Sequence, residues 1–294
     1  MVYSTARRLA AIAVACLGTF IATPANAAVP AQVYVAMGDS FASGPLILPQ
    51  EDLGCSRSAI NYPHLLAKRL GASSFTDVSC DSAGTIHFTT AQQRNPGGIT
   101  YPDAPPQFDA LSAGTTLVTM TIGGNDTGLV GVAGDCVNLL PVILGGKLCR
   151  DRYVVNGVDS EEQVIAQFGV KLATALDQIH AKSPKARVVL TGYGLYLRPN
   201  GCWPSVPVLP TDANYLQAKV DSMNATIKAT ALAHRAEYVD LRTPSAGHDA
   251  CADAATKWIE GYIPSGLAAP LHPNKAGEAA FAQIIGDYLA AHPA

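Results

Sequence analysis

Hydrophobic and polar residues alternate along this chain with two different periods. Short runs rich in β-branched and other apolar residues predict buried strands at 33–38, 75–80, 115–122, 187–191 and 237–240. Longer segments have apolar residues three or four positions apart and predict amphipathic helices at 61–70, 160–182, 212–235 and 275–291. Because strands and helices alternate, we expect an α/β fold in which one parallel sheet carries helices on both faces within a single domain.

Three long segments interrupt this alternation. Residues 95–106 are rich in proline and glycine, which predicts a loop. Residues 130–151 are rich in glycine and contain two cysteines, so we expect a loop or short helix held by a disulfide. Residues 193–210 predict a further long loop.

The N-terminus has the pattern of a secretory signal peptide. Arg7 and Arg8 precede an apolar run over 9–21, and residues 25–27 form an Ala-Asn-Ala cleavage site. The run is too short to span a membrane. It also continues past Cys16, which disfavours a lipoprotein anchor. We therefore expect a signal peptide at 1–27, a single mature domain at 28–294 without an integral membrane segment, and secretion.

Composition excludes several classes of partner. The chain has 20 basic and 23 acidic side chains, and none of the basic residues form a run suited to nucleic acid or an anionic membrane. With 48% hydrophobic and 15% charged residues, the sequence is that of a globular protein.

Six cysteines follow the predicted leader, at positions 55, 80, 136, 149, 202 and 251. An even number in an exported protein predicts disulfides, and six cysteines allow 15 pairings. None of them forms a C-x-x-C pair, which argues against a zinc site. We expect neither a metal nor an organic cofactor.

Polar turns follow three predicted strands, and they contain Ser40, Gly84 and Asn125. The carboxyl ends of parallel strands lie at one edge of a sheet, so these turns are expected to converge. His272, in a loop before the last helix, is placed to reach the same edge. Acyl transfer needs a nucleophile, a base and donors for the developing oxyanion, and these four residues offer that set. Alone, Ser40 would be interpreted as a turn residue.

These residues resemble the signature blocks of the SGNH (GDSL-type) hydrolases. The blocks are Gly38-Asp39-Ser40, Gly84, Gly123-Gly124-Asn125-Asp126 and His272, in the order that the family has them. The resemblance implies a three-layer, flavodoxin-like α/β/α sandwich. It also implies that Ser40 is the nucleophile and His272 the base, and that Gly84, Asn125 and the Ser40 N–H form the oxyanion hole.

The six cysteines and the stretch 243–251 resemble, more narrowly, the secreted actinobacterial lipases and esterases of that family. That branch joins its cysteines in sequential pairs. The resemblance therefore implies the disulfides Cys55–Cys80, Cys136–Cys149 and Cys202–Cys251.

One position departs from the family pattern. Most members have an aspartate three residues before the histidine, where this chain has Ala269, and no carboxylate occurs from 261 to 273. Two interpretations follow. A backbone carbonyl, of Ala269 or Pro270, accepts the His272 Nδ1–H, or a distant acid, Asp249 or Asp253, takes that role. We favour the carbonyl and hence a Ser-His dyad.

The sequence thus predicts a secreted, monomeric serine ester hydrolase, a lipase or esterase with phospholipase activity also open, whose partner is an ester or lipid substrate. A carbohydrate O-acetyl esterase and a catalytically lapsed binding protein are the alternatives. Fold and site do not fix the substrate or its acyl chain length. Tyr193, Tyr196 and Trp203 either form an acyl groove or pack a loop.

Overall fold

The computed structural model describes residues 1–2, 32–140 and 142–293. The chain divides into two units, Met1–Pro30 and Ala31–Ala294. Apart from residues 1–2, the predicted signal peptide at 1–27 lies outside the described residues. The architecture below is that of the second unit.

Five strands in the described part of that unit form one parallel sheet. Its order is β11 (Glu237–Val239), β10 (Arg187–Thr191), β7 (Leu117–Thr121), β1 (Val33–Gly38) and β4 (Ser74–Asp77). The central strand β7 is buried along its whole length. A sheet covered on both faces explains why these strands are continuous apolar runs instead of alternating ones.

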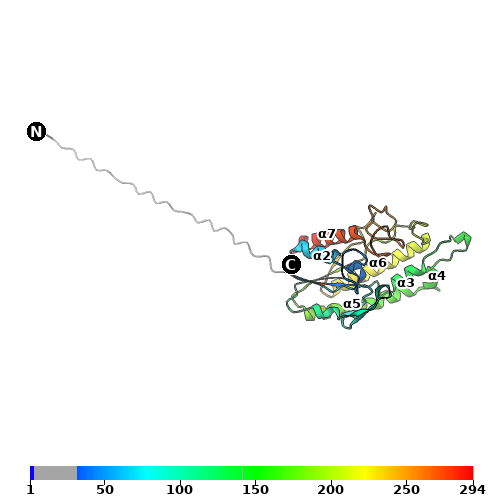
Figure 1. Ribbon diagram of the computed structural model, residues 1–294, viewed down its shortest axis with the longest axis horizontal. Helices are drawn as coiled ribbons and strands as arrows, with labels where there is room; N and C mark the ends of the chain where they lie inside the picture. The colour runs from blue at the N-terminus through cyan, green and yellow to red at the C-terminus, as the bar shows by residue number, and fades with distance from the viewer. Residues whose placement is uncertain (3–31, 141, 294) are drawn as a thin grey trace. The chain divides into compact units, whose positions relative to one another are not determined.

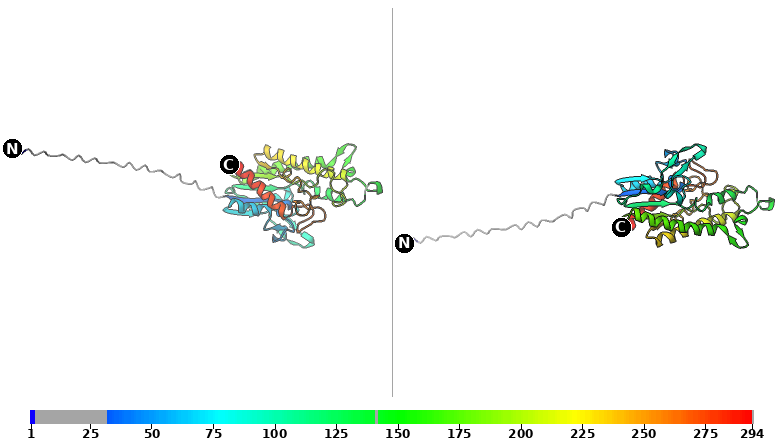
Figure 2. Two further views of the ribbon diagram at one scale, coloured as in Figure 1. Left: turned by 90° about the horizontal axis from the view of Figure 1, so that it is seen from above. Right: turned by 90° about the horizontal axis from the view of Figure 1, so that it is seen from below.

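Four long helices cover the sheet in two layers. The helices α2 (Tyr62–Leu70) and α7 (Lys275–Ala291) pack together, as do α5 (Ser160–Lys182) and α6 (Pro210–Ala233). Figure 1 shows α2 and α7 on one side of the strands and α5 on the other. The two opposite views of Figure 2 bring α7 to the front in one and α5 in the other. The predicted three-layer α/β/α sandwich is confirmed.

Strand β1 occupies the topological switch point of the sheet. The chain passes from β1 to β4 on one side of it and then returns to β7 on the other. Helices after these strands therefore diverge and leave a crevice at the carboxyl end of β1, where open α/β sheets bind ligands. Ser40 lies two residues beyond the end of β1.

The other elements are short. They are the helices α1 (Ser40–Ser43), α3 (Leu129–Asp135) and α4 (Arg150–Tyr153), four 3₁₀ turns (Thr85–Phe88, Pro96–Gly98, Gln107–Ala110 and Val142–Leu144), and the hairpins β2 (Gln50–Asp52) with β3 (Arg57–Ser58), β5 (Gln92–Arg94) with β6 (Tyr101–Ala104), and β8 (Val154–Val155) with β9 (Val158–Asp159). The prediction of a plain loop at 95–106 is wrong in part, because β6 lies within it. Pro102 in β6 has no N–H to donate to a neighbouring strand. It is tolerated because β5 and β6 form an isolated two-stranded ribbon, whose outer edges pair with no further strand in the described residues.

The disulfides join Cys55 to Cys80, Cys136 to Cys149, and Cys202 to Cys251. This is the sequential pairing that the family resemblance implies. The last of them ties the loop after β10 to the loop after β11. None of the helices in the described residues is both long enough and apolar enough to cross a membrane.

Candidate active site

The turn that carries Ser40 depends on Gly38, which ends β1 with a φ of 132°. A Cβ atom at this position would lie 2.2 Å from the carbonyl oxygen of Thr121, so no other residue fits. Asp39 then caps α1, because its Oδ1 accepts a hydrogen bond of 2.9 Å from the Phe41 N–H. The Ser40 N–H donates to no acceptor in the described residues, which leaves it free for a ligand.

His272 contacts Ser40 directly. Its Nε2 lies 2.7 Å from the Ser40 Oγ, and its Nδ1 lies 2.7 Å from the carbonyl oxygen of Pro270. Since a carbonyl only accepts, Nδ1 carries the proton, and Nε2 is left to accept the Ser40 O–H. Burial lowers the pKa of His272, more than the Pro270 carbonyl raises it, so the ring is neutral at neutral pH.

The His272 loop is held by Glu260, a buried carboxylate that sequence reasoning missed. The side chain is 1% exposed and accepts hydrogen bonds from the Ser265 N–H at 2.8 Å and the Asn274 Nδ2 at 2.9 Å. Burial would raise the pKa of Glu260, but these donors outweigh it and lower the pKa. The Glu260 N–H also donates to the His272 carbonyl at 2.9 Å. Glu260 thus holds the loop through both its side chain and its backbone N–H, and no local motif signals this role.

Neither of the two distant acids is engaged with His272. Asp249 is buried and accepts from the Arg198 Nε at 3.0 Å and the Cys251 N–H at 2.9 Å. Asp253 is exposed. Within the described residues neither carboxylate bonds to His272. The Ala269 carbonyl accepts the His272 backbone N–H at 3.3 Å, so Pro270 supplies the contact to the ring.

Of the expected oxyanion donors, two have partners already. The Asn125 Nδ2 donates to the Ala83 carbonyl at 2.8 Å, which leaves its second hydrogen unused by that bond. The Gly84 N–H donates to His87 Nδ1 at 3.0 Å. Burial lowers the pKa of His87, which keeps the ring neutral and able to accept. No sequence motif had indicated this role for His87.

An apolar cavity opens beside Ser40 and His272. Its volume is about 720 Å³, including its open mouth. Ser40, His272 and Asn125 line it together with Asp39, Phe41, Gly124, Leu129, Val130, Ala133, Tyr193, Tyr196, Leu197, Leu216, Val220, Met223, Tyr262 and Leu271. Gly84 instead lines a neighbouring cavity, which Asn125 also borders. Trp203 is absent from the lining of the first cavity, and its Nε1–H donates to the Asn138 carbonyl at 3.0 Å. Of the three aromatics, Tyr193 and Tyr196 therefore belong to the groove and Trp203 packs a loop.

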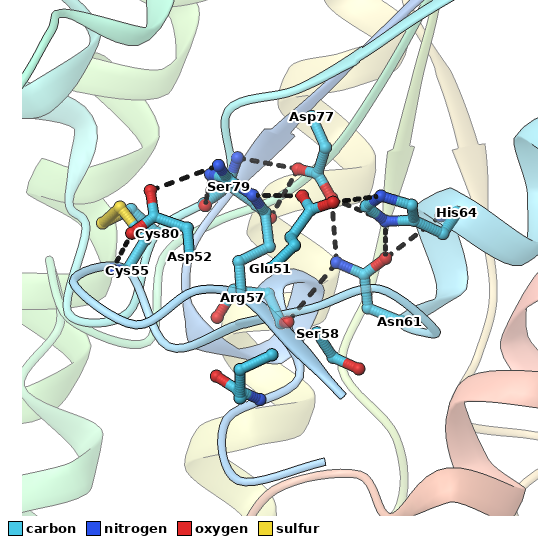
Figure 3. A network of polar contacts seen from close by, with 12 residues as sticks. Glu51, Asp52, Cys55, Arg57, Ser58, Asn61, His64, Asp77, Ser79 and Cys80 are labelled. Atoms are coloured by element: carbon cyan, nitrogen blue, oxygen red, sulfur yellow. Dashed lines mark hydrogen bonds and ion pairs between the residues drawn. A yellow bond between two sulfur atoms is a disulfide. The ribbon is translucent and has the colours of Figure 1, made fainter. Parts of the chain in front are cut away.

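A polar network, drawn in Figure 3, contacts the end of α1. Asn61 donates from Nδ2 to the Asp77 Oδ2 at 2.8 Å and to the Ser43 carbonyl at 3.3 Å. Its Oδ1 lies 2.7 Å from His64 Nδ1, while His64 Nε2 lies 2.9 Å from Glu51 Oε2. The network thus fastens the last turn of α1 to helix α2 and to the β2 strand.

Potential metal ligands in this network are Glu51, His64 and Asp77, whose donor atoms lie within 4.8 Å of one another. Protein groups already occupy them. Arg57 Nε lies 2.8 Å from Glu51 Oε1, and the Ser79 N–H and hydroxyl both bond to Asp77 Oδ1. Arg57 brings a positive charge beside the cluster, and every carboxylate oxygen in it already accepts a hydrogen bond. The cluster is therefore better explained as a structural network of ion pairs than as a cation-binding site.

The fold is a three-layer α/β/α sandwich, and a serine and a histidine contact each other at the carboxyl edge of its parallel sheet. The chain belongs to the GDSL-like lipase/acylhydrolase family, which residues 36–280 match. The resemblance seen in the sequence is therefore confirmed, and the protein is an ester hydrolase of the lipase and esterase kind.

Relatives of this chain include streptomycete enzymes. "Lipase 2" of Streptomyces coelicolor is 38% identical over 96% of this chain and 97% of its own length. Two crystal structures, a phospholipase A1 from Streptomyces albidoflavus and an extracellular lipase from Streptomyces rimosus, each superpose with a TM-score of 0.70. They are 26% and 25% identical, and each match covers 87% of this chain and 99% of the other.

Proposed function

We propose that this protein is a secreted lipase or esterase that works through an acyl-enzyme on Ser40. The observation that carries the proposal is the line of contacts from Ser40 Oγ to His272 Nε2, and from His272 Nδ1 to the Pro270 carbonyl. A nucleophile, a base within hydrogen-bond reach and a group that orients the base are the parts that nucleophilic catalysis requires.

In the first half-reaction, Ser40 Oγ attacks the ester carbonyl carbon as its proton passes to His272 Nε2. The carbonyl π bond breaks and leaves an oxyanion. Collapse of this intermediate breaks the bond to the alcohol, which leaves with the proton from His272. In the second half-reaction water repeats these steps, so that the acid is released and the Ser40 hydroxyl restored.

The Pro270 carbonyl takes the orienting role in this dyad. It holds the proton on Nδ1 and so selects the tautomer in which Nε2 is the base. The penalty of a wrong tautomer, about 10⁴ in rate, is thereby avoided. A neutral carbonyl stabilises the imidazolium less than a carboxylate would.

The Ser40 N–H and the Asn125 amide are the principal oxyanion donors in this proposal, since both lie at the cavity that holds Ser40 Oγ. Gly84 is the third donor that the family pattern implies. To act as a donor to the oxyanion, the Gly84 N–H must either break its hydrogen bond to His87 or divide it between His87 and the oxyanion.

We propose esters with an extended acyl chain as the substrates. The cavity lining is largely apolar, with Asp39 as its one acidic residue, and the segments 40–50, 127–134 and 261–274, which contribute residues to it, contain no Asp, Glu, Lys or Arg. Exposed Leu46, Val130, Ile263 and Leu267 lie on those loops. The names of the relatives, lipase and phospholipase A1, agree with lipid esters. A sugar acetate would find few polar partners here, which ranks the carbohydrate alternative lower.

A fluorophosphonate probe tests the assignment of Ser40. We expect the wild type to be labelled at Ser40 and to hydrolyse nitrophenyl esters, and Ser40→Ala to do neither. Ser43→Ala, which removes a buried hydroxyl on the same short helix, is the matched control and should be labelled normally. An unlabelled wild type would mean a lapsed binding protein, and an active Ser40→Ala would refute the nucleophile.

Secretion rests on the leader pattern and on the extracellular lipase among the structural neighbours. N-terminal sequencing of protein exported from an expressing host should begin at Ala28. Retention of the full-length chain inside the cell would contradict this.

A further inference from the structure

The hydroxyl of Tyr193 joins two turns that sequence reasoning treated separately. It donates a hydrogen bond to Asp39 Oδ2, a residue 154 positions away in the chain. The same oxygen accepts a hydrogen bond of 2.8 Å from the Gly124 N–H. Tyr193 follows β10, Asp39 follows β1 and Gly124 follows β7, so one phenol links the ends of three strands.

The two turns that it links carry the reacting groups. Asp39 immediately precedes Ser40, and its other oxygen accepts the Phe41 N–H that starts α1. Gly124 immediately precedes Asn125. The separation between the Ser40 Oγ and the Asn125 amide therefore depends on how far apart the hydroxyl of Tyr193 holds these two turns.

Tyr193 is itself held rigidly. Asn224 on α6 clamps its backbone, accepting from the Tyr193 N–H at 2.8 Å and donating to the Tyr193 carbonyl at 2.9 Å. The Tyr193 ring meets the Phe41 ring edge-on, with centroids 5.0 Å apart. The side chains of Tyr193 and Asp39 are buried, at 3% and 1% exposure. Because these contacts fix the Tyr193 ring, its hydroxyl has little freedom to move. The hydroxyl can therefore hold the two turns at a constant separation.

We propose that Tyr193 is a positioning residue that sets the distance between the nucleophile and the Asn125 oxyanion donor. The inference rests on the proposed function of Ser40 and Asn125. Tyr193 acts through Asp39 and Gly124, whose turns shift when the shared hydroxyl is lost. Misplacement of a catalytic group by about 1 Å costs on the order of 10²-fold in rate. The effect should fall on kcat, because oxyanion contacts strengthen in the transition state.

Tyr193→Phe keeps the ring and removes the hydroxyl. With nitrophenyl butyrate we expect kcat to fall about 10- to 100-fold and KM to change less than about 2-fold. The rate of phosphonylation at Ser40 should fall in parallel with kcat, since it needs the same oxyanion geometry.

Tyr34→Phe is the matched control. Tyr34 is buried on β1 of the same sheet, and its hydroxyl lies 2.6 Å from Thr119 Oγ1, away from the strand ends. We expect it to lower the melting temperature by an amount similar to Tyr193→Phe but to leave kcat within about 2-fold of wild type. A purely structural role for Tyr193 would make the two variants alike in kcat, which would overturn the proposal.

Asp39→Asn provides a second test, because the amide oxygen still accepts the Phe41 N–H. If Asp39 and Tyr193 act as one unit, the double variant should lose less activity than the product of the single losses. Independent losses would contradict the linkage. Failure of wild-type labelling at Ser40 would instead refute the proposed function.

Discussion

The Nδ1 atom of His272 lies 2.7 Å from the carbonyl oxygen of Pro270, only two residues earlier in the chain. Leu271 between them has a φ of 60°, in the left-handed region that leucine seldom adopts. This backbone turn brings the Pro270 carbonyl to the His272 ring. The acceptor is therefore part of the main chain, and replacing an acid elsewhere cannot remove it.

The two distant acids should consequently be dispensable for the chemistry. We expect Asp253→Ala and Asp249→Asn to keep kcat/KM within about 3-fold of wild type, because neither bonds to His272, whereas loss of a true triad acid costs about 10⁴-fold. Asparagine is chosen at 249 because it still accepts the Cys251 N–H. A loss of about 10³-fold from either variant, with circular dichroism unchanged, would contradict the dyad.

The pH profile of kcat/KM should reflect the lowered pKa of His272. The base must be neutral, so activity is full above this pKa and declines as the pH falls through it. Since burial lowers the pKa, the decline should occur below the usual histidine value of about 6.5. Burial also raises the pKa of Asp39, to about 7, so the profile should be repeated in Asp39→Asn to isolate the histidine. A decline centred above about pH 6.5 in that variant would be against the assignment.

The depth of the apolar cavity should set the preferred acyl chain. Val220 on α6 lines the cavity, and Val220→Phe would fill part of it. We expect hydrolysis of nitrophenyl octanoate to fall by about 10-fold or more while the acetate is affected less than about 3-fold. Leu232→Phe, at an exposed position near the end of the same helix, is the control and should leave the ratio unchanged. Equal effects on both esters would indicate that the acyl chain binds elsewhere.

His64 should make stability depend on pH. Burial by itself lowers the pKa of His64, but the Asp77 and Glu51 carboxylates outweigh it and raise the pKa. The charged ring therefore contributes stability that is fully present below the unfolded pKa of about 6.5 and is lost as the pH rises through the folded value. The melting temperature of wild type should exceed that of His64→Gln most at about pH 6, and the gap should narrow toward about pH 8.5.

The corresponding control is His292→Gln, an exposed position after α7, measured at the same pH values. A gap for His64→Gln that widens as the pH rises would show that the neutral ring, not the charged one, supports the network.

Much of the fold could be predicted because its signals are local. Buried strands of a doubly covered sheet need continuous apolar runs, and helices need a 3.6-residue period, so element type follows from near neighbours. The Gly38-Asp39-Ser40 sequence likewise predicts a tight turn at the end of β1 from neighbouring residues alone. The prediction at 95–106 failed in part because a short isolated hairpin tolerates the proline and glycine that usually mark a loop.

The sequence by itself determined the five strands of the sheet, the four long helices and the turns that carry Ser40, Asn125 and His272, since each depends on residues close in the chain. Tertiary structure decided which partners these groups meet. The strand order, which places β1 at the switch point, brings Tyr193 to Asp39 across 154 positions. Packing likewise decides that the Gly84 N–H donates a hydrogen bond to His87, and that the His272 ring bonds to the carbonyl of Pro270 rather than of Ala269. The hydrogen-bond partner of each of these groups depends on small differences in how the loops pack. Composition and periodicity do not encode distances between side chains that are remote in the chain.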